Sequence, residues 1–374
     1  MSQINVQNLS NENEDGAPEI ANISDFSATS YMCPPKGTTA QRPTSPNPGD
    51  IRFNTDTASL EYYRGDTLNW TQIEMTSPDL DGGARGFFAG GQTPSLSDRV
   101  DYITISTFGD AIDFGNLQAP KQRMGVTSDS TRLVTGGGYT TGFENEMDFF
   151  TMSSLGNATD FGNLTRSSNR LTAFADSTRG VWAGGNPSTN VIEYATIQSA
   201  GNTVDFGDLT VAGRQSVGGA SSSTRGLIFG GLSGSDPYTY HNIIDFVTIA
   251  TTGNAQDFGD LTTILMAGSA CANSTRALYC GGYSTPGNPI NNIEYVTIAT
   301  KGNSIDFGNG TLARKDGASL ASKTRGITAG GSNPTLQNRI DSMEIATTGN
   351  ALDFGDLSET RTSVSGSSNA HGGL

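Results

Sequence analysis

The segment SVGGASSSTRGLIFGG (residues 216–231), followed after a loop by NIIDFVTIATTGNAQDFGDLT (residues 242–262), indicates how this chain folds. Two polar turns interrupt its apolar and β-branched runs, Ser-Ser-Thr before Arg225 and Thr-Gly-Asn before Ala255. Gly-Asn tolerates the positive φ of a tight hairpin turn, and the runs alternate with a period of two instead of a helical period. The stretch therefore predicts four strands, at residues 216–221, 226–229, 243–251 and 256–261.

Six near-copies of this unit fill the chain from Ala84 onward. Each copy starts with an arginine, runs through small and apolar residues to a Gly-Gly pair, and continues to an Asp-Phe-Gly triplet. The arginines are Arg85, Arg132, Arg179, Arg225, Arg276 and Arg325. The triplets start at Asp113, Asp160, Asp205, Asp257, Asp306 and Asp353, so the steps between them are 47, 45, 52, 49 and 47 residues. A period in this range is typical of the blades of a β-propeller of kelch or WD type.

The two ends of the repeat region complement each other. Residues 361–374 match a first strand and its turn, whereas the first copy begins at Ala84 and Arg85 with a second strand. We expect residues 363–370 to pair alongside residues 86–89, which would close the ring and leave no terminal edge unpaired. The predicted fold is an all-β, six-bladed kelch-like β-propeller closed by its N- and C-terminal strands and preceded by a small β-meander attachment module.

Variable segments separate the Gly-Gly pair from the third strand. From the second glycine to the first residue of that strand they measure between 7 and 13 residues, whereas the other spacings are nearly constant, so these segments are predicted to be surface loops. Aromatic rings beside polar groups suit saccharide binding, because the rings stack on sugars and the polar groups bind hydroxyls. The alternative is that the loops are solvated tips or contact another protein. The predicted ligand- or receptor-binding residues are Tyr139, Phe143, Asp236, Tyr238, Tyr240, His241 and Tyr283.

Charged residues that recur in every copy are expected to hold the fold and not to catalyse a reaction. An acid follows the first residue of each third strand: Asp101, Asp148, Glu193, Asp245, Glu294 and Asp341. For the repeat arginines and triplet aspartates we predict either Arg–Asp pairs or arginine bonds to backbone carbonyls. With two histidines in the chain, no Ser/His/Asp arrangement is indicated. We therefore expect no enzyme activity, no cofactor and no metal.

The amino-acid composition and net charge argue against several kinds of binding partner and site. The chain has 374 residues and a formal net charge of −15, which argues against nucleic acid and against an anionic membrane surface. No stretch approaches 18 apolar residues, so we expect no membrane insertion, and the first residues do not resemble a secretory signal. Three cysteines are too few for a disulfide framework or a zinc site.

The residues before the repeats predict two further segments. Residues 1–42 are polar and are expected to be an extended arm, and residues 81–374 form the propeller. Between them, residues 43–80 predict a meander of three short strands at 51–53, 60–63 and 70–73. A sheet this small normally needs a partner, so we expect it to mediate attachment or oligomerisation. Its predicted contact residues are the aromatics Phe53, Tyr62, Tyr63 and Trp70.

A resemblance to a known family covers residues 44–374. GDIRFNTDTASLEYYRGDTLNWTQI (residues 49–73) resembles the small β motif near the N-termini of bacteriophage fibre and appendage proteins. STRGLIFGG (223–231), IEYVTIATKGNSIDFG (293–308) and NAQDFGDLT (254–262) resemble the kelch-related repeats of virion structural proteins, particularly those of tailed phages that infect marine cyanobacteria.

The resemblance implies a non-enzymatic virion component that is assembled in the host cytoplasm, with its N-terminus fixed to the particle and its propeller displayed. The implied partners are other virion proteins, bound through the arm, further copies of the chain, and a host-surface glycan or receptor. Two alternatives stay open. One is a purely architectural virion protein of the decoration, neck or baseplate periphery, and the other is a glycan-degrading enzyme.

Overall fold

The computed structural model describes residues 34–57, 59–65, 69–72, 84–187, 189–235, 237–284 and 288–374. It divides the chain into two compact units, Met1–Pro78 and Asp79–Leu374. The described residues form β-strands joined by turns, with one short 3-10 helix and no α-helix. None of the helices in these described ranges has the length and apolar character needed to cross a bilayer.

In its described residues the first unit contains one four-stranded sheet, in the order β1 (Lys36–Gly37), β2 (Ile51–Asn54), β3 (Ser59–Tyr63) and β4 (Trp70–Gln72). The three strands expected from the meander pattern are present as β2, β3 and β4. The sequence pattern missed β1, which pairs in parallel with β2 and is followed by the 3-10 helix η1 (Thr39–Gln41). Residues 36–41, expected in the arm, therefore belong to this sheet unit.

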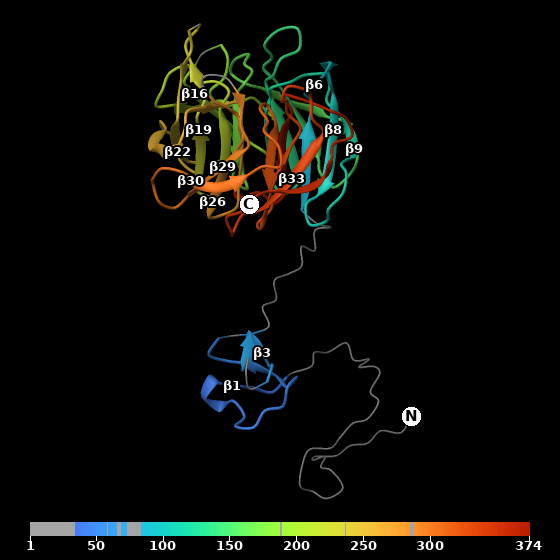
Figure 1. Cartoon of the computed structure of the whole chain (residues 1–374), viewed down its shortest axis with the longest axis vertical. Coiled ribbons are helices and arrows are strands. Elements are labelled where there is room, and N and C mark those ends of the chain that lie inside the picture. Colours follow the sequence, from blue (N-terminus) through green and yellow to red (C-terminus); the bar gives the residue numbers. More distant parts are fainter. Residues whose placement is uncertain are drawn as a thin grey trace, which may run out of the picture. The chain divides into compact units, whose positions relative to one another are not determined.

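The second unit contains six four-stranded antiparallel sheets in its described residues (Figure 1), each named here after its first strand. The β10 sheet consists of β10 (Gly125–Ser128), β11 (Arg132–Gly136), β12 (Glu146–Thr151) and β13 (Thr159–Asn163). The β14 sheet consists of β14 (Thr172–Ala175), β15 (Arg179–Ala183), β16 (Val191–Thr196) and β17 (Val204–Asp208). The β18 sheet consists of β18 (Gly218–Ser221), β19 (Arg225–Phe229), β22 (Ile243–Thr248) and β23 (Gln256–Asp260).

The other three sheets follow the same order. The β25 sheet consists of β25 (Ser269–Ala272), β26 (Arg276–Cys280), β29 (Asn292–Thr297) and β30 (Ile305–Asn309). The β31 sheet consists of β31 (Ala318–Ala321), β32 (Arg325–Ala329), β33 (Arg339–Glu344) and β34 (Leu352–Asp356). The β35 sheet consists of β35 (Ser365–Ser368), β5 (Arg85–Ala89), β8 (Arg99–Thr104) and β9 (Ile112–Asn116).

In three of the six sheets, the loop that joins the second strand to the third contains two short strands. They are β6 (Gln92–Thr93), β7 (Ser95–Leu96), β20 (Leu232–Ser233), β21 (Thr239–Tyr240), β27 (Tyr283–Ser284) and β28 (Asn288–Pro289). The strand β24 (Leu265–Met266) lies in the segment that enters the β25 sheet and pairs with β27.

The six sheets close into a ring through their first strands and through the two ends of the repeat region. The first strands contact one another in the circular order β10, β14, β18, β25, β31, β35 and back to β10. The expected end-to-end pairing is confirmed, because β35 pairs antiparallel with β5, with Ser365 opposite Ala89 and Ser368 opposite Gly86. One sheet is thus assembled from both ends, and no first strand is left without neighbours.

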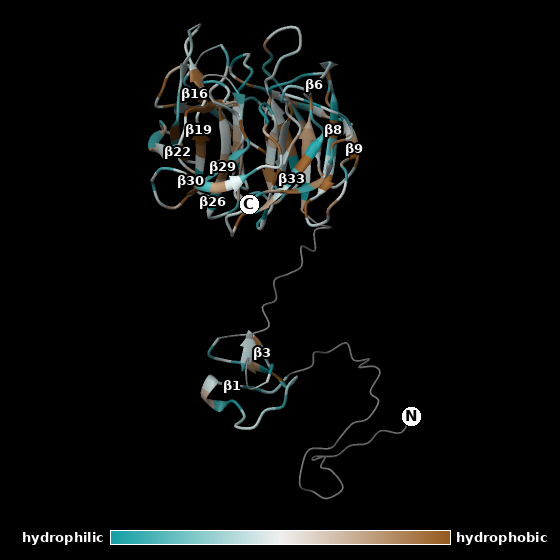
Figure 2. Cartoon of the chain, viewed as in Figure 1, coloured by the Kyte–Doolittle hydropathy of each residue, from teal (hydrophilic) through white to brown (hydrophobic). Residues whose placement is uncertain are grey.

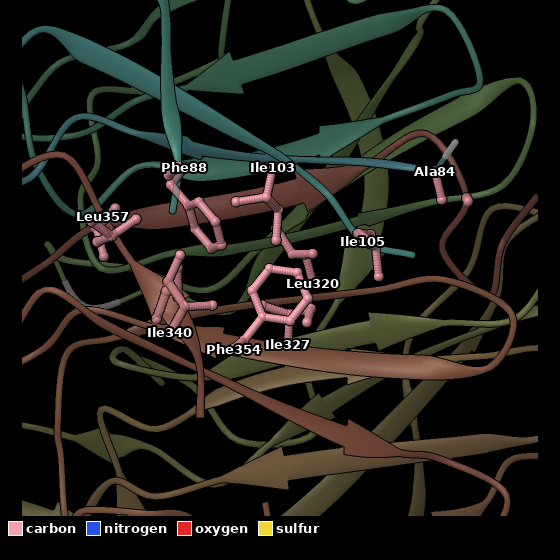
Figure 3. Close-up of a cluster of buried hydrophobic side chains, with 14 residues drawn as sticks. Ala84, Phe88, Ile103, Ile105, Leu320, Ile327, Ile340, Phe354 and Leu357 are labelled. Carbon is pink, nitrogen blue, oxygen red and sulfur yellow. The ribbon is translucent and has the colours of Figure 1, made fainter. Parts of the chain in front are cut away.

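One apolar cluster lies between each pair of neighbouring sheets. The six clusters account for most of the buried apolar side chains, and much of the apolar colour in Figure 2 lies on strands of the ring. Figure 3 shows the cluster between the β35 and β31 sheets, where Phe88 and Ile103 of the β35 sheet face Ile327 and Phe354 of the β31 sheet. The sheet assembled from both chain ends is therefore closed by strand pairing and is held to this neighbour by packing.

The Asp-Phe-Gly triplet and the Thr-Gly-Asn turn of the next sheet interlock. The N–H of Gly253 in the turn donates to the carbonyl of Phe206 at 2.8 Å, and the side-chain oxygen of Asn254 accepts the N–H of Asp208 at 3.1 Å. A Cβ on Gly207 would lie 2.5 Å from the carbonyl carbon and oxygen of Gly253, so this close approach requires glycine. Both motifs of the repeat are thus explained by one joint between sheets.

Candidate functional site

The repeat arginines join neighbouring sheets through backbone carbonyls. Arg225 Nη1 donates to the carbonyls of Ile298 and Ala299 in the next sheet, at 2.9 Å each, and its guanidinium lies over the Phe246 ring at 5.1 Å. The other five arginines likewise donate to a carbonyl of the next sheet around the ring. Of the two arrangements that we expected, the structure contains the arginine-to-backbone bonds.

The triplet aspartates occupy the outermost strands, and their side chains are exposed in all six copies. None of them pairs with a repeat arginine. Asp353 alone among the six has an ion pair in the described residues, with Arg339 at 3.0 Å. The aspartate is therefore the one member of the triplet that does not take part in the joint between sheets.

The six third-strand acids form a buried acid layer, defined as Asp101, Asp148, Glu193, Asp245, Glu294 and Asp341. Five of them face a cation from the segment that enters the same sheet. The nearest N–O distances are 2.5 Å for Arg361–Asp101, 2.9 Å for Lys121–Asp148, 3.9 Å for Arg166–Glu193, 3.3 Å for Arg214–Asp245 and 2.6 Å for Arg314–Asp341. A cation in contact stabilises a carboxylate that burial would otherwise make costly.

The β25 sheet departs from this pattern. Leu265 takes the place of the cation, and Glu294 instead accepts hydrogen bonds from the hydroxyls of Thr262 and Ser304, both at 2.5 Å. Its charge is held by neutral donors alone in the described residues. Every acid of the layer is thus engaged by a cation or by hydroxyl groups inside the scaffold.

The predicted loop residues lie on one edge of the ring but on separate sheets. Tyr139 and Phe143 form an edge-on ring pair in the β10 sheet, with centroids 6.0 Å apart and Phe143 40% exposed. In the β18 sheet, Tyr238 is 41% exposed and Tyr240 belongs to β21. Their neighbour Asp236 lies outside the described residues.

The remaining two predicted loop residues already have partners. His241 Nε2 lies 2.7 Å from Ser233 Oγ, and burial together with the charge of Arg214 lowers the pKa of His241. Tyr283, in the β25 sheet, lies under the ammonium group of Lys315 at 5.0 Å. Among the loop residues that the structure describes, no hydrogen bond, ion pair or ring contact joins one sheet to another, and none of them lines the cavities described below.

The first unit contains a buried carboxylate, Glu61, on the face of the sheet that also carries Tyr63. Tyr63 is buried and contacts Trp70, with ring centroids 5.5 Å apart, whereas Phe53, Tyr62 and Trp70 are half-buried. Beside them, Glu61 accepts Arg42 Nη2 at 2.6 Å and Asn54 Nδ2 at 3.1 Å. The hydrogen bond from Arg42 lowers the pKa of Glu61 despite its burial.

Three overlapping cavities follow the central axis of the ring and form a single axial well. The middle of the well is lined by glycine, alanine and apolar side chains and by the hydroxyl residues Thr172, Ser269, Ser319 and Ser365. Its mouth is an open cavity of about 440 Å³, including the solvent at the opening. The mouth lies on the edge that carries the variable loops, since the loops and the segments entering each sheet share that edge.

Residues 369–374 close the other end of the well. The N–H of Gly373 donates to His371 Nδ1 at 3.1 Å, so the proton is on Nε2, which donates to the Ser128 carbonyl at 2.7 Å. The N–H of Gly372 donates to the Ala272 carbonyl at 2.8 Å. Ser128 and Ala272 belong to opposite sheets, so the tail crosses the axis, and burial lowers the pKa of His371.

The mouth is framed by a closed circle of six backbone hydrogen bonds, one per sheet. Each residue donates its N–H to the carbonyl of the preceding member, at 2.7 to 3.1 Å. The six residues all have φ between +55° and +59°, which is costly for residues with a side chain. This mouth ring consists of Arg123, Arg170, Ser216, Ala267, Asp316 and Ser363.

The side chains of the mouth ring break the symmetry that its backbone keeps. Arg123 and Arg170 are neighbours in the circle, and Asp316 stands opposite Arg170. Burial and the nearby charge of Arg170 lower the pKa of Arg123, while Asp316 opposes that effect. Burial raises the pKa of Asp316, opposed by Arg123, Lys315 and Arg170. The three charges therefore form one interacting group at the opening of the well.

Sequence reasoning did not single out the mouth ring. Its members stand ten or eleven residues after each triplet aspartate, in a column where the aligned copies carry Arg, Arg, Ser, Ala, Asp and Ser. A change of charge at one fixed position of an otherwise regular repeat is the signal that could have found it. No group of three or more His, Cys, Asp and Glu residues in the described ranges could hold a metal ion.

Comparison with known proteins finds no matching family model and no matching curated protein.

Proposed function

We propose that this protein is a non-enzymatic appendage component of a tailed-bacteriophage virion. In this proposal its first unit attaches to the particle, and its ring is a six-bladed kelch-like β-propeller that recognises a glycan on the host surface. The observation that carries the recognition role is the mouth ring, because its side chains differ between sheets while the scaffold around it repeats. The virion assignment is supported by the resemblance of residues 44–374 to phage appendage proteins.

Binding fits the distribution of carboxylates better than catalysis does. Glycoside hydrolysis uses two carboxyl groups that flank the bond to be cut. The mouth ring contains one carboxylate, Asp316, and the six acids of the buried acid layer are occupied by cations or hydroxyls. Incubation of the full chain with host polysaccharide should therefore release no new reducing ends, and release of oligosaccharides would overturn this part of the proposal.

The test of the virion assignment is to locate the chain on intact particles with an antibody against the ring, by electron microscopy. We expect labelling of an outward appendage. Labelling of no part of purified particles would contradict the assignment. A glycan array probed with the full chain tests recognition separately.

A purely architectural role is the second candidate, and one observation favours it. The residue before the triplet aspartate is a highly exposed apolar side chain in four of the six sheets: Ile112 (60%), Val204 (51%), Ile305 (55%) and Leu352 (65%). Such side chains on outermost strands suit lateral contacts with other proteins. Cross-linking on intact particles that captures these strands, together with a blank glycan array, would establish this alternative.

A further inference from the structure

The mouth of the axial well holds positive charge that the described residues do not neutralise by contact. The guanidinium of Arg170 has no hydrogen bond or ion pair in these residues. In Arg123 only Nε donates, to Ser363 Oγ at 3.3 Å. The chain as a whole carries a formal net charge of −15, and the arginines of the buried acid layer are all paired. Two adjacent guanidinium groups that make no ion pair and keep free N–H donors suit an anionic ligand.

The wall below the arginines has a different chemistry. Thr172, Ser269, Ser319 and Ser365 contribute hydroxyls to a section that is otherwise lined by glycine, alanine and apolar side chains. Hydroxyls of this kind exchange hydrogen bonds with a ligand that itself carries several hydroxyls. Across the circle from Arg170, the carboxylate of Asp316 can accept a hydroxyl donor but repels a bare anion.

We propose that the mouth of the well binds the terminal residue of an acidic saccharide. The carboxylate of a uronic-acid-type sugar lies against Arg123 and Arg170, and a ring hydroxyl of the same sugar donates to Asp316. A planar carboxylate matches the fork of a guanidinium, which favours two parallel hydrogen bonds. The proposal deepens the proposed recognition function, and it rests on that function only for the source of the sugar, a host-surface glycan.

The floor of the well determines which part of a glycan can enter. Because residues 369–374 cross the axis between the β10 and β25 sheets, a polysaccharide cannot thread through the ring. The mouth can accept a free monosaccharide or the end of a chain. The site is thus specific for the ends of saccharide chains, and the amount of polysaccharide bound should be proportional to its number of chain ends.

The experiment is titration calorimetry of the full chain with three probes: glucuronate, glucose and acetate. We expect glucuronate to bind at least about tenfold more tightly than either of the others, because it alone offers both a carboxylate and hydroxyls. Equal binding of glucose and glucuronate would overturn the role of the arginines. Absence of glucuronate binding up to about 20 mM would overturn the proposal.

Variants assign the binding to the mouth ring. Arg170→Asn and Arg123→Asn remove the charge, and asparagine tolerates the positive φ of these positions. Each should weaken glucuronate binding by at least about tenfold, whereas Arg64→Asn, which removes an exposed arginine from the first unit, should leave it unchanged. Wild-type affinity in both mouth variants, with melting temperatures that show folded protein, would refute the site.

The variant Asp316→Asn distinguishes a site that recognises a sugar from a site that binds any small anion. Removal of the carboxylate should weaken glucuronate binding, because a hydroxyl acceptor is lost, and should leave acetate binding equal or tighter, because a like charge is lost. Tighter binding of both probes would show that the site accepts anions without recognising the sugar.

The result of the glucuronate titration is independent of the labelling of virions by electron microscopy. Glucuronate binding by a chain that is not found on virions would refute the proposed function alone. A chain located on virions that binds no acidic sugar would refute this inference alone.

Discussion

The buried acid layer and the mouth ring come from the same repeat, but only one of them keeps its chemistry in every sheet. All six positions of the layer are acids, and five face a cation. The mouth ring keeps one backbone conformation in all six sheets, while its side chains are basic, hydroxylic, apolar or acidic. The charges that repeat in every sheet therefore hold this fold together. The charges that do not repeat are the ones to examine for function.

The largest effect should follow removal of one cation from the layer. Arg361→Met leaves the fully buried Asp101 without its partner, and an uncompensated buried charge typically costs about 3–5 kcal/mol. Denaturant unfolding followed by circular dichroism measures the loss. The double variant Arg361→Met/Asp101→Asn should recover part of it, and a single variant as stable as the wild type would show that the layer is not structural.

The joint between sheets can be broken at one glycine and left intact at another. Gly207→Ala places a Cβ against the carbonyl of Gly253, whereas Gly253→Ala meets nothing within 4 Å, although φ is +148° and +157° in the two glycines. Gly207→Ala should therefore be the more destabilising variant by about 1–3 kcal/mol. Equal unfolding free energies for the two variants would mean that backbone conformation, and not the joint, explains the glycine.

Removal of a repeat arginine should have an effect of similar size. Arg225→Ala deletes two charge-assisted hydrogen bonds to carbonyls and should cost about 1.5–3 kcal/mol, with a lower melting temperature. The matched control is Asp257→Asn in the same sheet, an exposed triplet aspartate whose loss should change stability by no more than about 0.5 kcal/mol. An equal loss of unfolding free energy in both variants would instead support the predicted Arg–Asp pair.

The buried carboxylate of Glu61, in the first unit, should make the stability of that unit depend on pH. The folded-state pKa of Glu61 lies below its unfolded value because of the hydrogen bond from Arg42. Its contribution to the first unit is therefore present above the unfolded pKa and is lost as the pH falls through the folded pKa. The NMR signal of the Trp70 indole in the full chain should report this loss in acid. Glu61→Gln should remove this pH dependence, and an unchanged acid transition in that variant would assign it to another group.

The smallest effect on stability is expected at the loops. Tyr238→Ala truncates an exposed side chain and should change the unfolding free energy by no more than about 0.5 kcal/mol. If the loops share in recognition, the same variant should bind host cells less well in an adsorption assay. Unchanged adsorption would restrict recognition to the mouth ring.

Spacing in the sequence predicted the four-stranded units and the pairing of β35 with β5, because strand length and turn chemistry are local properties of the chain. It placed the first strand two residues early, at 216 instead of Gly218, since Ser216 adopts the positive φ of the mouth ring. It could not identify the partners of the arginines. Those partners are carbonyls on a neighbouring sheet, and carbonyls have no signature in the sequence.

The candidate site escaped prediction for a related reason. Arg123 and Arg170 are close only because separate copies meet at the axis, and each alone looks like an ordinary loop arginine. The predicted loop tyrosines stand out by composition, yet the structure keeps those of different sheets apart. A search for aromatic residues therefore led to the edge of the ring that also carries the mouth, and it missed the group of charges at its centre.

The seam between β5 and β35 also governs the order in which the chain can fold. The hydrogen bond between Arg85 and Asn369 spans 284 residues, so β5 leaves the ribosome long before its partner strand exists. Until then the nascent protein carries an unpaired strand edge, which is prone to aggregation. Pairing between segments so far apart in the sequence is also slow. A circular permutant that begins with β35 and continues directly into β5 would complete this sheet first and should refold faster than the natural order.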